Sequence, residues 1–247
     1  MQQLGYQSQL QPFSYTAGFF TEMSGQNVVA TLMPSHPVKA HVILTAHYDH
    51  LGKQGDSLYA GANDNASGVS ALLFLAAQFA ETILPFQISF VATDAEENGL
   101  HGAKFFVSQL PPDDSVTILN INLDMLAVSR ADKTLYAFTS YAQRHALQSQ
   151  LSAITSDTIK IKVTSSANTM NRLNQGSNID WRRASDHYAF AKAGFAYIYF
   201  GMGYDPHHHQ RSDLLSNIDQ NLYIEAVNYI TQFIQQLDMT KLTEAAQ

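Results

Sequence analysis

The chain has 247 residues, of which 45% are hydrophobic and only 14% carry a charge, and its formal net charge is −7. This acidic balance gives no reason to expect a nucleic acid or an anionic membrane as a partner. The absence of cysteine excludes disulfides, thiolate metal sites and cysteine nucleophiles, and no apolar run approaches the roughly 18 residues of a membrane-spanning helix.

Short apolar segments predict the strands of a buried sheet. Continuous runs of this kind are typical of central strands that are covered on both faces. In chain order, we expect strands at residues 27–33, 41–47, 86–94, 116–125, 133–139 and 195–201.

Helical patterns alternate with these strands. We expect helices at residues 66–81, 99–110, 141–155, 185–194 and 219–237, the second of which stops at Pro111 and Pro112 because proline cannot continue a helix. The last helix carries one apolar stripe, made of Leu222, Ala226, Tyr229, Ile230, Phe233, Ile234 and Leu237. The alternation predicts a three-layer α/β/α sandwich around a mixed, mostly parallel central sheet.

The chain shows no sign of a division into domains. It has no internal repeat, low-complexity tract or linker rich in proline and glycine. We therefore expect residues 1–247 to form a single domain, with residues 1–25 as an N-terminal segment.

Ionisable side chains gather at the ends of the expected strands and in the loops that follow them. They are His47, Asp49, Asp64, Glu96, Glu97, Asp124 and His209. Each has an ordinary explanation when taken alone, such as a helix N-cap for Asp64. A buried carboxylate such as that of Asp124 is costly without a partner, however, and the carboxyl ends of strands are where α/β proteins bind ligands. One shared cause explains the set better than several separate ones.

That shared cause is metal binding. Two imidazoles and three or four carboxylates without a thiolate suit zinc, or cobalt or manganese at the same ligands. Five ligands serve two metal ions if one carboxylate bridges them, and such a pair activates water for hydrolysis. Consecutive side chains on an extended segment point in opposite directions, so one of Glu96 and Glu97 can bind metal while the other faces the substrate.

The motifs that contain these residues resemble a known family. "AHYDHLG" (46–52), "GANDNASG" (61–68), "DAEENGLHGA" (94–103), "NLDM" (122–125), "SDHYAF" (185–190) and a histidine four residues before an aspartate are similar to the motifs of the M28 family of zinc aminopeptidases. They occur in the order of that family and span about residues 27–213.

The resemblance implies a role for each residue. His47, Asp64 and Asp124 would hold one Zn2+ and Asp64, Glu97 and His209 the second, with Asp64 as the bridge. Glu96 would be the general base that accepts a proton from a water activated by the two zinc ions. Asp49 would orient His47 by accepting its remaining ring N–H. The substrates would be peptides with a free N-terminus, cleaved at the first peptide bond, and a cis peptide bond would follow Asp64.

Some neighbouring residues are open to two interpretations. The spacing to Asp213 selects His209 as the ligand, with His208 as the alternative, and His50 is taken as a bystander. Ser185, Asp186 and His187 cannot form a nucleophilic triad, because adjacent helical residues do not face one another. Asp186 and His187 either support the pocket or serve in capping and packing.

The chain departs from the family pattern in two places. Some members have a tyrosine, which binds the oxyanion, at the position of Arg182, so here the donor is Arg182, Arg183 or the metal ions. Many members begin with a longer N-terminal helical segment, and we expect residues 1–25 to be a truncated counterpart of it. The resemblance implies a secreted or periplasmic location, although the first residues lack the basic and apolar regions of a signal peptide.

Three rival functions remain from the sequence. Glutaminyl cyclases share the scaffold but cyclise an N-terminal glutamine with one zinc, whereas the complete ligand set favours hydrolysis. Zinc carboxypeptidases and deacylases combine similar motifs, but they usually insert a dimerisation domain where this chain has too few residues between Asp124 and His209. A non-catalytic relative would have lost ligands, and every ligand position is filled here.

Overall fold

The chain builds one large mixed sheet. The computed structural model describes residues 4–18, 20–34, 37–111, 115–128, 132–172 and 179–244. The four strands in the middle of the sheet run parallel to one another, and antiparallel pairings occur at β1–β2, β2–β6 and β8–β10. The predicted mixed sheet is confirmed. The strand order is β1 (Gln7–Ala17), β2 (Thr21–Leu32), β6 (Gln87–Thr93), β3 (Ala40–His47), β7 (Thr117–Leu123), β10 (Ala196–Gly201), β8 (Thr134–Thr139) and β9 (Lys160–Thr164).

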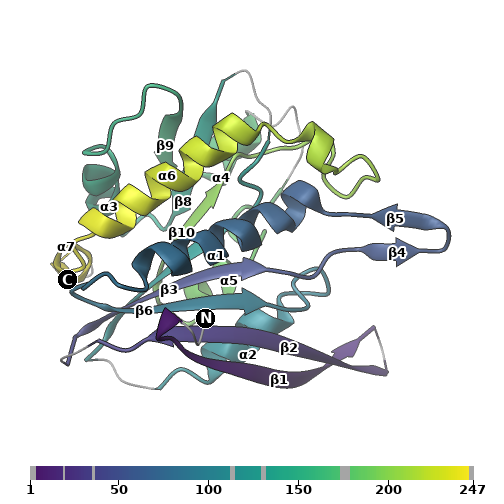
Figure 1. Ribbon diagram of the computed structural model, residues 1–247, viewed down its shortest axis with the longest axis horizontal. Coiled ribbons are helices and arrows are strands. Elements are labelled where there is room, and N and C mark those ends of the chain that lie inside the picture. Colours follow the sequence, from purple (N-terminus) through teal and green to yellow (C-terminus); the bar gives the residue numbers. More distant parts are fainter. Residues whose placement is uncertain are drawn as a thin grey trace.

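Helices cover both faces of this sheet. One face packs against α1 (Gly68–Phe79), α3 (Arg144–Leu151), α6 (Gln220–Gln236) and α7 (Thr240–Glu244), of which α1 and α6 lie in front in Figure 1. The other face packs against α2 (His101–Ser108), α4 (Ala167–Arg172) and α5 (His187–Lys192). In β3, Leu44 belongs to the first core and Ile43 to the second, because successive side chains of a strand point to opposite faces. The predicted α/β/α sandwich is confirmed.

The five expected helices and six expected strands are present, with small shifts of their ends except at the start of β2. The apolar stripe of α6 is buried throughout, from Leu222 to Leu237, which is 4% exposed. Asp219 caps this helix, since its side chain accepts a hydrogen bond from the backbone N–H of Leu222 at 3.0 Å.

Strands with few apolar side chains were not predicted from the sequence. Residues 7–17 form β1 and pair along their whole length with β2, which begins at Thr21 rather than at residue 27. The hairpin of β4 (Gly52–Gln54) and β5 (Ser57–Tyr59) and the edge strand β9 were also not expected. Their backbones pair while many of their side chains face solvent, so hydrophobic periodicity does not reveal them.

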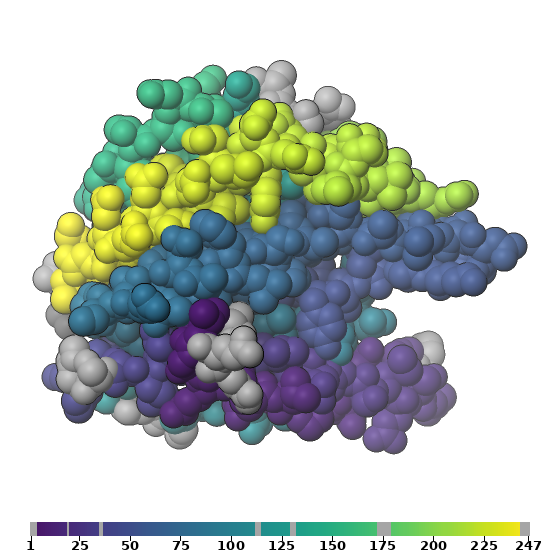
Figure 2. All heavy atoms as spheres, viewed as in Figure 1, coloured from purple at the N-terminus to yellow at the C-terminus, as the bar shows by residue number. Residues whose placement is uncertain are grey.

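The sheet brings the expected site residues to one edge. The carboxyl ends of β3 and β6 point toward the side from which the β4–β5 hairpin projects (Figure 1). The surface is hollowed between this hairpin and the end of the β1–β2 ribbon (Figure 2). Before α1, the kinked segment η2 (Ala62–Ser67) carries Asp64, whose backbone is not helical, and the expected cis peptide bond between Asp64 and Asn65 is present.

None of the helices in the described part of the chain is both long and apolar enough to cross a lipid bilayer.

Candidate metal centre

Three of the predicted ligands meet in a buried cluster behind the ends of β3 and β7. His47 Nε2 lies 3.3 Å from Asp64 Oδ1 and 3.5 Å from Asp124 Oδ1. All three residues are at most 5% exposed, and their ligand atoms lie within 4.8 Å of one another. This is the first of the two predicted ligand sets.

The second predicted set faces the other oxygen of Asp64. His209 Nε2 lies 3.3 Å from Asp64 Oδ2 and 3.0 Å from Glu97 Oε2. Asp64 therefore presents Oδ1 to one group of residues and Oδ2 to another, which is the arrangement that a bridging carboxylate requires.

Two further imidazoles reach Asp64 Oδ2. His208 Nε2 is 3.3 Å from that oxygen, and its ring stacks on the ring of His209. His50 Nδ1 lies 3.6 Å from the same oxygen and 2.9 Å from Glu97 Oε1. The sequence interpretation took His50 as a bystander, yet it is part of this cluster. The first motif contains it three residues after His47, but spacing alone did not indicate that its ring turns toward Glu97.

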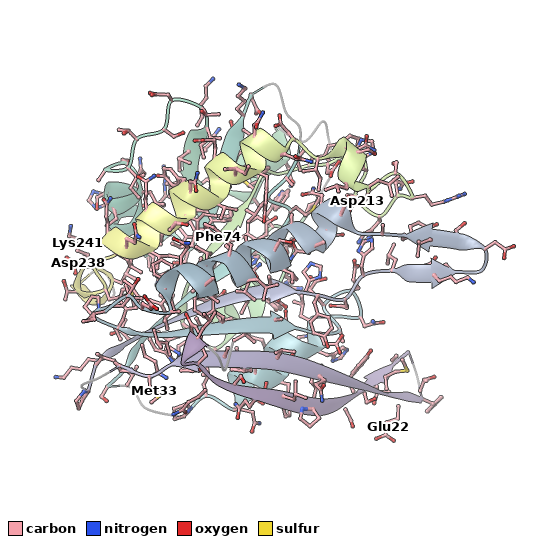
Figure 3. The ribbon with its side chains drawn as sticks, in the orientation of Figure 1. Glu22, Met33, Phe74, Asp213, Asp238 and Lys241 are labelled. Atoms are coloured by element: carbon pink, nitrogen blue, oxygen red, sulfur yellow. The ribbon has the colours of Figure 1, made fainter. Side chains whose placement is uncertain are left out.

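Two distant aspartates hold the segment that carries Asp64. The carboxylate of Asp213 accepts hydrogen bonds from the backbone N–H groups of Asn63 and Asp64 at 2.7 and 3.0 Å. Asp205 Oδ2 accepts a hydrogen bond from Asn63 Nδ2 at 2.7 Å. Figure 3 shows Asp213 beside the start of α1. The loop that supplies His209 thus also fixes Asp64, although the two are far apart in sequence.

Asp49 contacts a different group from the one expected. The ring nitrogen Nδ1 of His47 meets the backbone carbonyl oxygen of Asp49 at 3.1 Å, whereas the nearest carboxylate oxygen of Asp49 is 3.8 Å away. That carboxylate instead accepts hydrogen bonds from the backbone N–H groups of Glu96 and Glu97 at 3.0 and 3.1 Å. Asp49 therefore orients His47 through its main chain and the glutamate pair through its side chain.

Glu96 lines a cavity of about 440 Å³ that opens at the cluster. Among the described residues, no hydrogen bond engages its carboxyl group. The same cavity is lined by carboxylates of Asp64, Glu97 and Asp124 and by apolar side chains, including that of Trp181. A carboxyl group that is free to exchange a proton thus faces a chamber large enough for part of a small ligand.

Burial and charge strongly perturb the ionisation of these groups. Burial raises the pKa of Glu96 well above its usual value. Burial opposes ionisation of Glu97 as well, but hydrogen bonds from His209 and His50 lower the pKa of Glu97 to about 2. Hydrogen bonds to Asp64 and Glu97 raise the pKa of His209 to about 10. Burial alone would lower the pKa of His47, yet hydrogen bonds to Asp124 and Asp64 raise it well above normal.

The residues fit a cation. Within the described part of the chain, Asp64 Oδ2, Asp124 Oδ1 and both ring nitrogens of His50 are buried without a well-directed hydrogen bond, and such atoms normally have partners. The donor set holds only nitrogen and oxygen atoms, which suits zinc. Because imidazole must lose its proton to bind a metal, the raised pKa values of His47 and His209 imply that binding weakens as the pH falls.

The remaining motif residues have structural partners. Asp186 Oδ2 accepts a hydrogen bond from Thr93 Oγ1 at 2.5 Å, and His187 Nε2 lies 2.9 Å from the carbonyl oxygen of Trp181. Both side chains are fully buried. Ser185 Oγ accepts from Asn122 Nδ2 at 2.7 Å rather than capping α5. These three residues are therefore buried between Ala184 and Tyr188, which line the cavity.

Comparison with known proteins identifies the family. Residues 27–234 match the peptidase family M28. The chain belongs to this family. Aminopeptidase YwaD of Bacillus subtilis is 35% identical over 114 residues, which amount to 44% of this chain and 24% of that protein. The aligned part of the chain thus covers about a quarter of the length of this relative.

Solved structures share the fold of this M28 chain. BSAP, a zinc aminopeptidase from Bacillus subtilis, superposes with a TM-score of 0.67 at 24% identity over 90% of this chain and 54% of BSAP. Porphyromonas gingivalis glutaminyl cyclase gives a TM-score of 0.70 at 18% identity over 95% of this chain and 85% of the cyclase. At these identities the likeness establishes the fold and not the reaction.

Proposed function

We propose that this chain is a zinc-dependent aminopeptidase that hydrolyses the N-terminal peptide bond of peptides. The observation that carries the proposal is the position of Asp64, whose Oδ1 faces His47 at 3.3 Å and whose Oδ2 faces His209 at 3.3 Å. A carboxylate shared in this way by two ligand sets suits a pair of metal ions. Membership of a peptidase family and the likeness to a zinc aminopeptidase support the same reaction and metal.

Two groups of residues would hold the metal ions. His47 and Asp124 would bind one zinc, Glu97 and His209 the other, and Asp64 both. Zinc supplies Lewis-acid activation of a water molecule and of the scissile carbonyl group.

Glu96 would move the proton in this reaction. The water oxygen bonds to the carbonyl carbon as Glu96 takes up a proton from the water, and Glu96 returns a proton to the leaving amine as the C–N bond breaks. Burial raises the pKa of Glu96 well above its usual value, which suits a group that must both accept and release a proton.

The charge of the cavity favours a substrate with a free amine. Glu96 and Asp205 line it and are not among the predicted zinc ligands, and Lys104 and Arg183 line it as well. Because zinc would neutralise Asp64, Glu97 and Asp124, the carboxylates of Glu96 and Asp205 are the ones that can attract a cationic group. The free N-terminus of a peptide carries such a charge, whereas an acylated N-terminus does not.

A glutaminyl cyclase is the second candidate, since a solved cyclase has the same fold along 85% of its length. Cyclisation consumes an N-terminal glutamine without adding water. The presence of two ligand sets around Asp64 favours the aminopeptidase, because one metal ion suffices for a cyclase.

The two candidates can be separated with a panel of substrates. We expect the zinc-loaded protein to release p-nitroaniline from leucine and alanine p-nitroanilides but not from their N-acetyl derivatives, and a chelator to stop the release. Failure to cleave any free aminoacyl p-nitroanilide would contradict the proposal. Conversion of a glutaminyl peptide to its pyroglutamyl form without such cleavage would support the cyclase.

A further inference from the structure

A tyrosine that the sequence motifs did not single out reaches the metal centre. Tyr199 lies near the end of β10 and is only 1% exposed, yet it lines the cavity. Its ring packs against the rings of Trp181 and His187, with centroids 5.9 and 5.2 Å apart. These contacts fix the ring and leave its phenolic end to face the cavity.

Gly201 makes room for this hydroxyl group. A Cβ atom placed on Gly201 would lie 2.5 Å from Tyr199 Oη and 2.6 Å from the backbone carbonyl oxygen of Asp124. Both distances are far below van der Waals contact. Only glycine therefore lets the phenol lie along the strand with its oxygen beside Asp124, one of the predicted metal ligands.

The hydroxyl group has no protein partner among the described residues. A buried tyrosine normally pairs its hydroxyl group, as Tyr6 and Tyr229 do here with the backbone oxygens of Ala76 and Leu151 at 2.7 and 2.5 Å. A buried donor without a partner is unusual in folded proteins. The hydroxyl of Tyr199 is thus available to an acceptor that enters the cavity.

A phenol has an ordinary pKa of about 10. The hydroxyl of Tyr199 is therefore a neutral hydrogen-bond donor near neutral pH.

The two arginines considered as donors have other partners. Arg182 has a side chain that is 72% exposed, is not among the residues that line the cavity, and has its Nε 3.2 Å from Asp180 Oδ1. Arg183 lines the cavity, but its guanidinium lies over the ring of Tyr188, 5.4 Å from the ring centroid. The protein donor that lies beside Asp124 is Tyr199.

We propose that Tyr199 is a catalytic residue whose Oη donates a hydrogen bond to the carbonyl oxygen of the scissile bond. As the water oxygen bonds to the carbonyl carbon and Glu96 takes the proton, the π electron pair of the carbonyl group moves onto its oxygen. The phenol stabilises the resulting charge until the C–N bond breaks and the carbonyl group re-forms. This assignment rests on the aminopeptidase reaction proposed above.

The test compares Tyr199→Phe with Tyr197→Phe in zinc-loaded protein. Both residues lie on β10 and in the same aromatic cluster, but Tyr197 is not among the residues that line the cavity. Loss of one oxyanion donor lowers kcat by about 10²–10³-fold in other enzymes. We expect Tyr199→Phe to lower kcat by about 100-fold with little change in KM, to a similar extent for alanine, leucine and phenylalanine p-nitroanilides, and Tyr197→Phe to match the wild type.

A binding measurement separates this role from a structural one. The phosphonic acid analogue of leucine has the tetrahedral oxygens of the intermediate, so Tyr199→Phe should weaken its binding by about tenfold or more in calorimetry. Zinc content and Tm should stay those of the wild type.

Other outcomes would overturn the assignment in distinct ways. If the wild type is active and Tyr199→Phe has an unchanged kcat and unchanged phosphonate binding, the role given to Tyr199 is wrong. The proposed aminopeptidase function would still stand. A loss confined to one substrate side chain would show that Tyr199 shapes the side-chain pocket instead. An inactive wild type would overturn the proposed function and this assignment together.

Discussion

At the scale of single residues, the proposed metal centre depends most on Asp64. Its two carboxylate oxygens face different ligand sets, and its backbone N–H is held by Asp213 at 3.0 Å. Hydrogen bonds from His208, His209 and His47 outweigh the effect of burial and lower the pKa of this carboxyl group. Asp64 is therefore ionised and fixed in place before any metal ion arrives.

Asp64→Asn should disturb both metal ions at once. The amide keeps the shape of the side chain but replaces one of the two shared oxygens by a nitrogen that cannot act as a ligand. We expect zinc per chain, measured by elemental analysis, to fall from about two to one or less and turnover to fall by at least about 100-fold. Asp56→Asn, at an exposed position between β4 and β5, is the control. Full zinc content in Asp64→Asn would show that this residue does not bridge.

Glu96→Gln should separate catalysis from metal binding. The glutamine fills the same space but cannot accept a proton, and general acid–base catalysis contributes about 10²–10⁴-fold. We expect both zinc ions to remain while turnover falls within that range, whereas Glu81→Gln at an exposed position should change neither. If Glu96→Gln lost zinc and Glu97→Gln kept it, the roles of the two glutamates would be exchanged.

At the scale of elements, the ends of strands and the loops that follow them carry the predicted ligands, and the loops set their orientation. Four residues other than glycine have a positive φ in or beside the site, namely Ala95, Leu100, Met125 and His209. Such conformations cost of order 1–3 kcal/mol each and gather where function needs a particular geometry. The turns after β6 and β7 and the loop that carries His209 are thus held in conformations that packing alone would not select.

The sequence was sufficient to predict the central strands of the sheet but not its edge strands. The runs at β3, β7 and β10 are apolar because helices cover both faces, so composition alone predicted them. The ribbon of β1 and β2 is held by backbone hydrogen bonds between largely polar segments, which leave no periodic signal. The motifs predicted most of the residues that gather at the site. They did not predict the contacts of His50, Asp49 and Tyr199. The direction of a ring and the choice between a carboxylate and a carbonyl oxygen depend on the folded backbone.

A histidine on β3 makes the sheet sensitive to acid. His41 Nε2 lies 2.8 Å from Ser89 Oγ, and burial lowers the pKa of His41 to about 4. Below the unfolded value of about 6.5, the unfolded chain takes up a proton at this residue and the folded chain does not. Stability is therefore lost as the pH falls from about 6.5 to 4, by up to about 3 kcal/mol from this group.

His41→Gln removes this proton uptake. In urea unfolding of metal-free protein at pH 7 and pH 4.5, we expect the variant to lose less free energy of unfolding between the two values than the wild type. His145→Gln, at an exposed position on α3, should lose as much as the wild type. An equal loss in all three proteins would contradict the role given to His41.

At the scale of the whole molecule, the centre joins segments from most of the chain. Its residues come from the ends of β3, β6 and β7, from η2 and from the loop before α6. Without a cation, several carboxylates and imidazoles share this buried space. A metal pair would therefore act as a cross-link between distant segments as well as a catalyst.

Removing the metal ions should lower the stability of the entire fold. A ligand that binds only the folded state stabilises it by about 2.7 kcal/mol at a free concentration 100 times its Kd. We expect the Tm in scanning calorimetry to fall after dialysis against a chelator and to recover on addition of Zn2+, and Ca2+ to have little effect because the site contains imidazole ligands. A Tm that is the same with and without zinc would contradict this cross-link.

The most direct test of the account is a zinc titration of metal-free protein, followed by the release of p-nitroaniline from leucine p-nitroanilide. If five residues hold a pair of ions around Asp64, activity should rise with added zinc and reach its plateau at two equivalents per chain. A plateau at one equivalent, or no release with two equivalents bound, would contradict the account.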